Sequence, residues 1–172
     1  MTTTLTRPSS ETLLDLFRNT FRRHAGGVVV CTTVDDDGTP VGFTATSLAS
    51  LSAVPPRATF NMIKSSSSFR AVQLGCRIAV NFLGAGSHEL GQRFAGPAEE
   101  RFAGDHWHEE RGLPVIDDAG VVLFTKVASI YDHGENAIVV LEIQDGTLGD
   151  DQDPLLYHNR RFGTIAPVDP AR

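Results

Sequence analysis

The chain has 172 residues, of which 41% are hydrophobic and 21% charged, an ordinary composition for one soluble globular domain. Its formal net charge is −6, and its basic residues do not gather into a stripe. A polyphosphate backbone needs such a stripe, so nucleic acid is not an expected partner. No apolar run approaches the roughly 20 residues that a membrane helix requires, and residues 1–10 lack the features of a secretory signal. We therefore expect a cytoplasmic protein with no membrane partner.

The first predicted element is an amphipathic helix within residues 11–27. Its apolar residues recur every four positions, at Leu13, Phe17 and Phe21. Ser9 or Ser10 is suited to cap its start, and Gly26 is suited to end it.

Strands dominate the rest of the chain. Apolar runs of strand length occupy residues 27–34, 41–47, 57–63, 76–83, 121–131 and 136–149. An Asp-Gly turn within residues 35–39 indicates that the first two strands form a hairpin. The Asp triplet is not expected to bind calcium, because it lacks the ligand spacing and the closing Glu of a calcium loop. Short helices are expected at 64–76 and 86–94, and a polar loop at 95–117.

The balance of strands and helices predicts the fold class. Strands outnumber helices and do not alternate with them regularly, which indicates an antiparallel barrel with a few peripheral helices. No GxGxxG motif follows a strand, so a nucleotide would bind without a Rossmann fold. Cys31 and Cys76 lie in two of the strand-like runs, where thiols usually act as small buried hydrophobic groups, and we expect no disulfide.

A cluster of hydroxyl side chains in the segment GFTATSLASLS, residues 42–52, is the first candidate binding feature. Its members are Thr44, Thr46, Ser47, Ser50 and Ser52. Hydroxyls and free backbone amides at a strand exit suit the polar edge and ribityl chain of a flavin. Composition alone favours a turn whose hydroxyls bond their own backbone.

The segment KSSSSF, residues 64–69, is the second candidate. At the start of a predicted helix it would offer free N–H groups, serine donors and the Lys64 cation to a phosphate. An ordinary N-cap is the alternative.

His106 and His108 would share a face if extended, but the sequence offers no evident third ligand, so a solvated loop anchored by Trp107 is expected there instead of a metal site.

Five segments together resemble the short-chain flavin reductases, the NAD(P)H-dependent partners of two-component flavin monooxygenases. They are GFTATSLASLSAVPPRATFNMIKSSSSF, IAVNFLGAGSHELGQRFAG, EERFAGDHW, YDHGENAIVVLEIQD and PLLYHNRRFG. The resemblance runs from about residue 14 to 165, in order and at matching spacing, so we expect one domain over residues 1–172 with its core there. It implies an FMN-binding split barrel, Greek-key-like and antiparallel, that forms a homodimer.

The resemblance also implies site positions. Thr44, Ala45, Thr46 and Ser47 would line the isoalloxazine ring and ribityl chain, with Ser50 and Ser52 nearby. Lys64, Ser65, Ser66 and Ser67 would meet the phosphate. Asn81 would approach the flavin, and Arg93 would help neutralise the phosphate.

The nicotinamide side departs from the family pattern. Many relatives carry Gly-Asp-His where this chain has Gly134-Glu135-Asn136, and that His lies near the nicotinamide. Asn136 can hydrogen-bond but does not titrate near pH 7. Asn136 and His133 are both nicotinamide-site candidates, although His133 would point to the other face of a continuous strand. Tyr157, with His158 beside it, is a further nicotinamide-site candidate or a structural residue at a strand end.

The expected function is an NAD(P)H:flavin oxidoreductase, in which FMN or FAD takes a hydride from NADH or NADPH and then serves a separate oxygenase. The two cofactors carry the chemistry, so no catalytic nucleophile or base is expected, and the sequence offers no Ser–His–Asp arrangement. The alternative is a flavin- or haem-binding barrel without nicotinamide turnover. A third hypothesis is a tightly held flavin that acts directly on an organic substrate.

Overall fold

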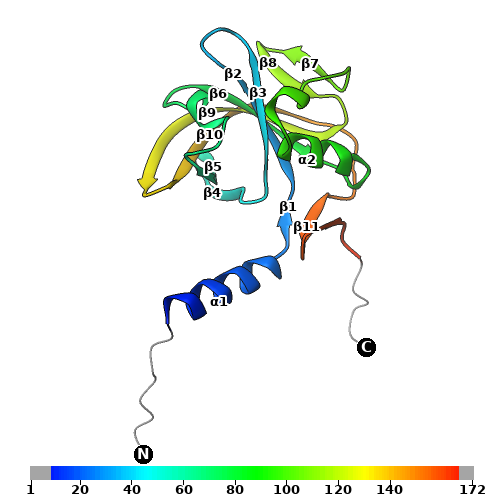
Figure 1. Cartoon of the computed structure of the whole chain (residues 1–172). Coiled ribbons are helices and arrows are strands. Elements are labelled where there is room, and N and C mark those ends of the chain that lie inside the picture. Colours follow the sequence, from blue (N-terminus) through cyan, green and yellow to red (C-terminus); the bar gives the residue numbers. More distant parts are fainter. Residues whose placement is uncertain (1–8, 167–172) are drawn as a thin grey trace, which may run out of the picture.

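The computed structural model describes residues 9–166 and is built around one seven-stranded sheet (Figure 1). Its strands are β2 Val29–Val34, β3 Pro40–Ala45, β4 Ala49–Ala53, β5 Pro56–Ile63, β6 Arg77–Leu83, β9 Ala119–His133 and β10 Asn136–Leu148. Their order is β3-β2-β6-β9-β10-β5-β4, and every pairing is antiparallel. The predicted antiparallel architecture is confirmed.

The two edge strands of this sheet are neighbours in sequence. Only residues 46–48 join β3 to β4, so the sheet must curl until its first and last strands approach each other. Ser47 lies at the seam, where its hydroxyl accepts a hydrogen bond from the Asn61 N–H at 2.9 Å and donates one to the Asn61 carbonyl at 3.3 Å. The result is an open barrel.

Alternating side chains from these strands fill the barrel. The interior cluster comprises Val29, Cys31, Phe43, Ala45, Phe60, Met62, Val72, Ile78, Val80, Val127, Val139 and Leu141. The rings of Phe43 and Phe60 meet across it with centroids 5.6 Å apart. Burial raises the pKa of the Cys31 thiol to about 12, so this group stays neutral and apolar, and both cysteines are free. A ligand therefore has to bind outside this core.

Small elements pack on the outside of the barrel. Helix α2, His88–Ala95, lies against β3 and β2, and Phe94 is its fully buried anchor. A second sheet has three strands, β1 Gly26–Gly27, β11 Leu156–His158 and β12 Arg161–Gly163, and β11 pairs with the other two. Single 3-10 turns occur at η1 Phe69–Ala71, η2 Ala85–Ser87 and η3 Ala98–Glu100.

The loop predicted at 95–117 is wrong in its second half. That half forms a hairpin, β7 Trp107–Glu110 and β8 Leu113–Ile116. Arg111 and Gly112 make its two-residue turn with φ of 55° and 74°, the left-handed conformation that such tight hairpins need. All four residues of β8 are buried. The charged sequence of β7 made the whole segment resemble a polar loop, so the buried strand β8 was not predicted.

The helix predicted at 64–76 is also wrong, since only the single turn η1 forms. Backbone bonds from Ser66 N to the Ile63 carbonyl and from Phe69 N to the Ser66 carbonyl make successive turns instead. The Ser66 hydroxyl accepts from the Ser68 N–H, which illustrates how serine competes for backbone groups and disfavours a helix.

The predicted first helix is confirmed as α1, Ser10–Arg22. The Ser9 hydroxyl caps it by accepting from Thr12 N at 3.2 Å. It ends at Arg22, before the expected Gly26, which instead pairs with Tyr157 in the small sheet. None of the α1 residues is buried. Among residues 9–166, no helix has the length and apolar character needed to span a membrane.

Gly42 on β3 permits the close approach of α2. A Cβ built there would lie 2.7 Å from a Phe94 ring carbon and 3.0 Å from Phe102. We expect Gly42→Ala to lower the free energy of unfolding by about 1–3 kcal/mol, because the two rings must shift out of a packed site. Chemical denaturation measures this. Gly86→Ala, where the new methyl meets open space, should stay within about 0.5 kcal/mol of wild type; equal losses would contradict the packing argument.

Candidate flavin and nicotinamide site

A cavity of about 610 Å³ opens where the start of β3 meets the turn after β5 and the segment that follows α2. We call it the Lys64 pocket. Three of the predicted phosphate residues, Lys64, Ser66 and Ser67, line it together with Gly42. Ser65 is exposed and is not among its lining residues. The structure thus brings most of the KSSSS segment to one cavity, although no α-helix begins there and only the single turn η1 follows.

Arg101 forms one wall of the Lys64 pocket. Its guanidinium donates to the Gly42 carbonyl at 2.8 Å, to the Ser68 hydroxyl at 2.9 Å, and to the Gly96 carbonyl. These contacts hold β3, the serine turn and the end of α2 in one arrangement. Partial burial lowers the pKa of the Arg101 guanidinium, which nevertheless remains a cation at neutral pH. Arg101 therefore adds positive charge to the pocket while fixing its walls.

The charges at this pocket are mixed. Asp35 and Glu99 also line it, and Asp35 lies 3.9 Å from the guanidinium of Arg70. Lys64 is paired with Asp132 at the end of β9. An anion that binds Lys64 must therefore compete with the Asp132 carboxylate.

The β9–β10 hairpin turn lies against the Lys64 pocket. The Lys64 N–H donates to the Glu135 carbonyl at 2.9 Å, and Lys64 and Asp132 form the side-chain pair. Lys64 of the candidate phosphate segment and the hairpin that carries His133 and Asn136, far apart in sequence, thus lie side by side.

The expected orientation of His133 is wrong. The strand is not continuous there, because Gly134 and Glu135 make a turn in which Gly134 has φ of 62°. His133 and Asn136 are consequently direct partners across the hairpin. Direct partners in an antiparallel pair point to the same face. The chain therefore presents an exposed imidazole beside Asn136.

A second cavity, of about 510 Å³, lies further along β3. We call it the Thr44 cavity; its lining includes Thr44 and Thr46 of the hydroxyl cluster, Gln92 of α2, and Tyr157 and Phe162 of the small sheet. Gly26 packs here as well, since a Cβ at that position would lie 2.6 Å from the Thr46 carbonyl oxygen. Tyr157 thus belongs to this cavity and not to the hairpin that carries His133 and Asn136.

Most hydroxyls of residues 42–52 have structural partners. Thr44 donates to the Gly91 carbonyl of α2 at 2.7 Å, and Ser52 donates to the Pro55 carbonyl at 2.6 Å. Ala45 points into the barrel core, so only its backbone faces the exterior. Ser50 is exposed on β4. The alternative of turn and strand residues that bond their own backbone therefore describes part of this segment.

Two predicted residues lie elsewhere. Asn81 is completely buried, and its amide donates to the Val30 carbonyl at 2.9 Å and accepts from the Ile116 N–H at 3.0 Å. Its hydrogen bonds join β6, β2 and β8, so it is not available to a ligand outside the barrel. Arg93 donates to the Ala103 carbonyl at 2.5 Å and is not among the residues lining the Lys64 pocket.

Sequence reasoning missed Arg101 and Asp132. Arg101 lies in the segment EERFAGDHW, directly after two glutamates. This cluster of charges was the one feature of the sequence that could have indicated a functional role for Arg101. Asp132 could not be identified, because its pairing with Lys64 depends on the β5–β10–β9 register.

The histidines that suggested a metal have other partners. His106 Nε2 lies 2.9 Å from the Arg101 carbonyl, and His108 pairs with Asp117. Trp107 donates to the Phe102 carbonyl and packs on its ring, which anchors this segment as expected. Within residues 9–166, no three His, Cys, Asp or Glu side chains are grouped as a metal site.

Comparison with known proteins defines the class. Residues 21–166 match the flavin reductase like domain. An NADH:FMN oxidoreductase of Rhodococcus qingshengii is 36% identical over 159 residues, 88% of this chain and 82% of that protein. Reductase subunit HsaB of a Mycobacterium tuberculosis flavin-dependent monooxygenase is 32% identical over 154 residues, which are 88% of this chain and 82% of that protein. The crystal structure of a flavin reductase domain protein from Arthrobacter sp. FB24 has a TM-score of 0.86 at 44% identity, covering 91% of this chain and 98% of that one. The chain belongs to the flavin reductase family.

Asn81→Ala tests whether this residue is structural. Truncation leaves the Ile116 N–H and the Val30 carbonyl without their side-chain partner in the core, and we expect the free energy of unfolding to fall by about 2–4 kcal/mol. Chemical denaturation gives this value, with exposed Ser65→Ala as a control that stays near wild type. If the variant kept its stability but lost affinity for flavin, the structural role would be contradicted and Asn81 would be a flavin-binding residue.

Proposed function

We propose that this protein is an NAD(P)H:flavin oxidoreductase that transfers hydride from a reduced nicotinamide to FMN or FAD. The observation that supports it most is the meeting of the Lys64–Ser67 turn with the 132–136 hairpin beside Arg101, in a chain of this family. An anion-accepting pocket thus adjoins residues suited to contact a second nucleotide.

The residues of the Lys64 pocket fit a flavin phosphate. Lys64 and Arg101 supply positive charge, and the exposed hydroxyl of Ser67 supplies a donor. The Thr44 cavity offers the Thr46 backbone and the partly apolar surface of Tyr157 further along β3. A ribityl chain and ring system that start at the first cavity would follow this strand toward the second.

The chain's role in the reaction is positioning. When bound together, flavin accepts and nicotinamide donates the hydride, and the protein needs no nucleophile. Lys64 and the serine turn hold the flavin's charged end, while β3 orients the remainder. His133 and Asn136 are proposed to contact the nicotinamide nucleotide, because they share the face of the hairpin whose turn adjoins Lys64.

The wider role follows from the relatives. We propose that reduced flavin passes to a separate flavin-dependent oxygenase, as the name of the Mycobacterium tuberculosis relative implies for that protein. We also propose a homodimer, from the family resemblance, and a cytoplasmic location, which agrees with two free cysteines.

Pairing assays test the proposed activity. Purified protein with NADH or NADPH and FMN or FAD should oxidise the nicotinamide at a rate proportional to enzyme concentration, followed by loss of absorbance at 340 nm. The NADH–FMN pair is the first choice, given the Rhodococcus relative. No stimulation in any of the four pairings would refute the proposal. A yellow protein without turnover would favour the flavin- or haem-binding alternative, and reduction without release would favour direct action on an organic substrate.

Asp132→Asn tests whether Lys64 binds phosphate. The Asp132 carboxylate competes with an incoming anion, so its removal should raise FMN affinity by about 2–5-fold, the range of an exposed ion pair, and leave riboflavin affinity unchanged. Fluorescence titration measures both affinities. Asp118→Asn removes the same charge at another exposed position and should change neither. Equal shifts for FMN and riboflavin would show that Lys64 does not contact the phosphate.

A further inference from the structure

Helix α1 carries an apolar stripe that nothing within residues 9–166 buries. Its large hydrophobic side chains are 43–60% exposed, and they are Leu13, Leu14, Leu16, Phe17 and Phe21. Figure 1 shows α1 projecting from the barrel past β1 and β11. A 13-residue helix is marginal in water without tertiary packing, so this stripe requires a covering surface.

The base of α1 is fixed in this projecting direction. Arg22 Nε donates to Asn159 Oδ1, and the Asn159 N–H donates to the Arg22 carbonyl, both at 2.8 Å. Asn159 lies in the turn between β11 and β12, with φ of 51°. These bonds tie the end of α1 to the small sheet, and the apolar side chains of its stripe stay exposed.

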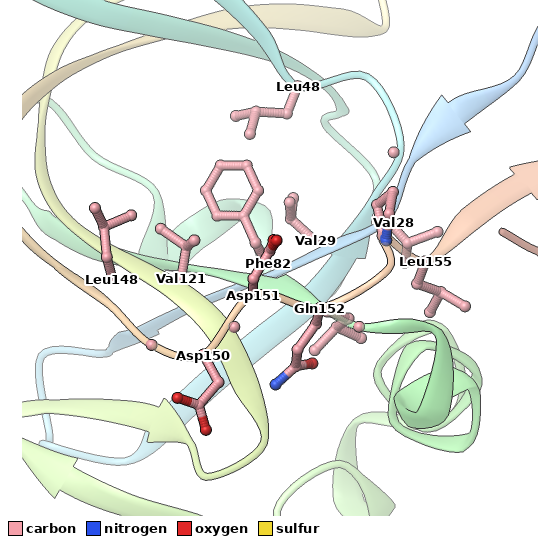
Figure 2. Close-up of a pocket in the computed structure, with 16 residues that line it drawn as sticks. Val28, Val29, Leu48, Phe82, Val121, Leu148, Asp150, Asp151, Gln152 and Leu155 are labelled. Carbon is pink, nitrogen blue, oxygen red and sulfur yellow. The ribbon is translucent and has the colours of Figure 1, made fainter. Parts of the chain in front are cut away.

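One end of the barrel offers a complementary surface, which we call the barrel mouth. It is a cavity of about 420 Å³ whose apolar lining includes Leu48, Phe82, Val121 and Leu148. Figure 2 shows these four side chains around the hollow, with Asp150 and Gln152 on the segment beside it. Leu148 is 83% exposed, so the mouth, like α1, leaves large apolar groups in water.

Charged residues of opposite sign lie at the barrel mouth and beside the apolar stripe of α1. Asp150 and Asp151 line the barrel mouth, and both are exposed. On α1, Arg18 lies four residues after Leu14 and three before Phe21, so at helical spacing it borders the stripe. Arg23 follows at the end of the helix. The basic residues beside the stripe thus lie toward the end of α1, with Glu11 and Asp15 nearer its start, and the barrel mouth has an acidic rim.

We propose that α1 of one copy packs its apolar stripe over the barrel mouth of a second copy, and that the second copy returns the same contact. Because each chain carries both surfaces, a two-fold axis satisfies both at once and closes the assembly. Reciprocal exchange doubles the buried area, toward the roughly 1,200–2,000 Å² of a stable interface. The inference rests on the proposed homodimer and is independent of flavin reduction.

Charged substitutions in the stripe test this contact in the full chain. Wild type should sediment as a dimer at micromolar concentration, and Phe17→Glu with Phe21→Glu should raise the dimer dissociation constant by about 100-fold or more. Leu148→Glu at the mouth should act in the same direction. Asn19→Glu adds a charge to the polar face of α1 and should leave the dimer intact. A monomeric wild type, or a dimer indifferent to the stripe and mouth variants, would overturn the proposal.

Cross-linking separates exchange from other arrangements. In a Cys76→Ala background, Thr20→Cys within the stripe and Leu148→Cys at the mouth are made in separate chains and mixed. A short bismaleimide should yield covalent dimers only in the mixture, and a chain with both cysteines should also cross-link between copies. A cross-linked monomer would mean that α1 folds over its own barrel, which overturns the proposal, as would no cross-linking. Nicotinamide oxidation by the same preparations reports separately on the proposed activity.

Discussion

The three-residue link between β3 and β4 is the constraint from which the rest of the structure follows. It forces the two edge strands of a seven-stranded sheet together, and Ser47 secures the seam through both backbone groups of Asn61. Once the sheet is curled, its inward side chains fill the interior, and the cavities described lie around the outside and at one end of the barrel. The segment of residues 42–52 therefore both closes the barrel, through Ser47, and borders the Thr44 cavity, through Thr44 and Thr46.

Buried glycine and polar side chains fix how the outer elements sit on this barrel. Gly42 lets Phe94 and Phe102 approach β3, and Arg101 donates a hydrogen bond to the Gly42 carbonyl. Asn81 satisfies the backbone of β8, which could not otherwise be buried without leaving a free N–H. Packing and hydrogen bonding thus converge on β3 and its neighbours, and they set the shape of the Lys64 pocket.

The sequence predicted the features that depend on local periodicity and on family spacing. Alternating apolar runs identified the strands and the barrel class, and the four-residue spacing of Leu13, Phe17 and Phe21 identified α1. It failed where turns decide the outcome. The serine turn after Ile63 replaced a helix, the Arg111–Gly112 turn produced a hairpin, and Gly134–Glu135 reversed the orientation expected for His133. Arg101, Asn81 and Asp132 depend on long-range register, which one sequence does not encode visibly.

The filled interior has a consequence for how such a protein changes over generations. Cores resist substitution because each side chain there contacts many others, whereas exposed turns tolerate it. The segments around the Lys64 pocket are mostly turns outside the barrel, so substitutions there would leave the packing of Phe43 and Phe60 in place. Arg101 and Gly42 are the exceptions, since Arg101 holds β3, the serine turn and the end of α2 together and Gly42 makes room for Phe94 and Phe102. If this pocket binds a nucleotide as proposed, the preference for that nucleotide would change more easily than the barrel itself.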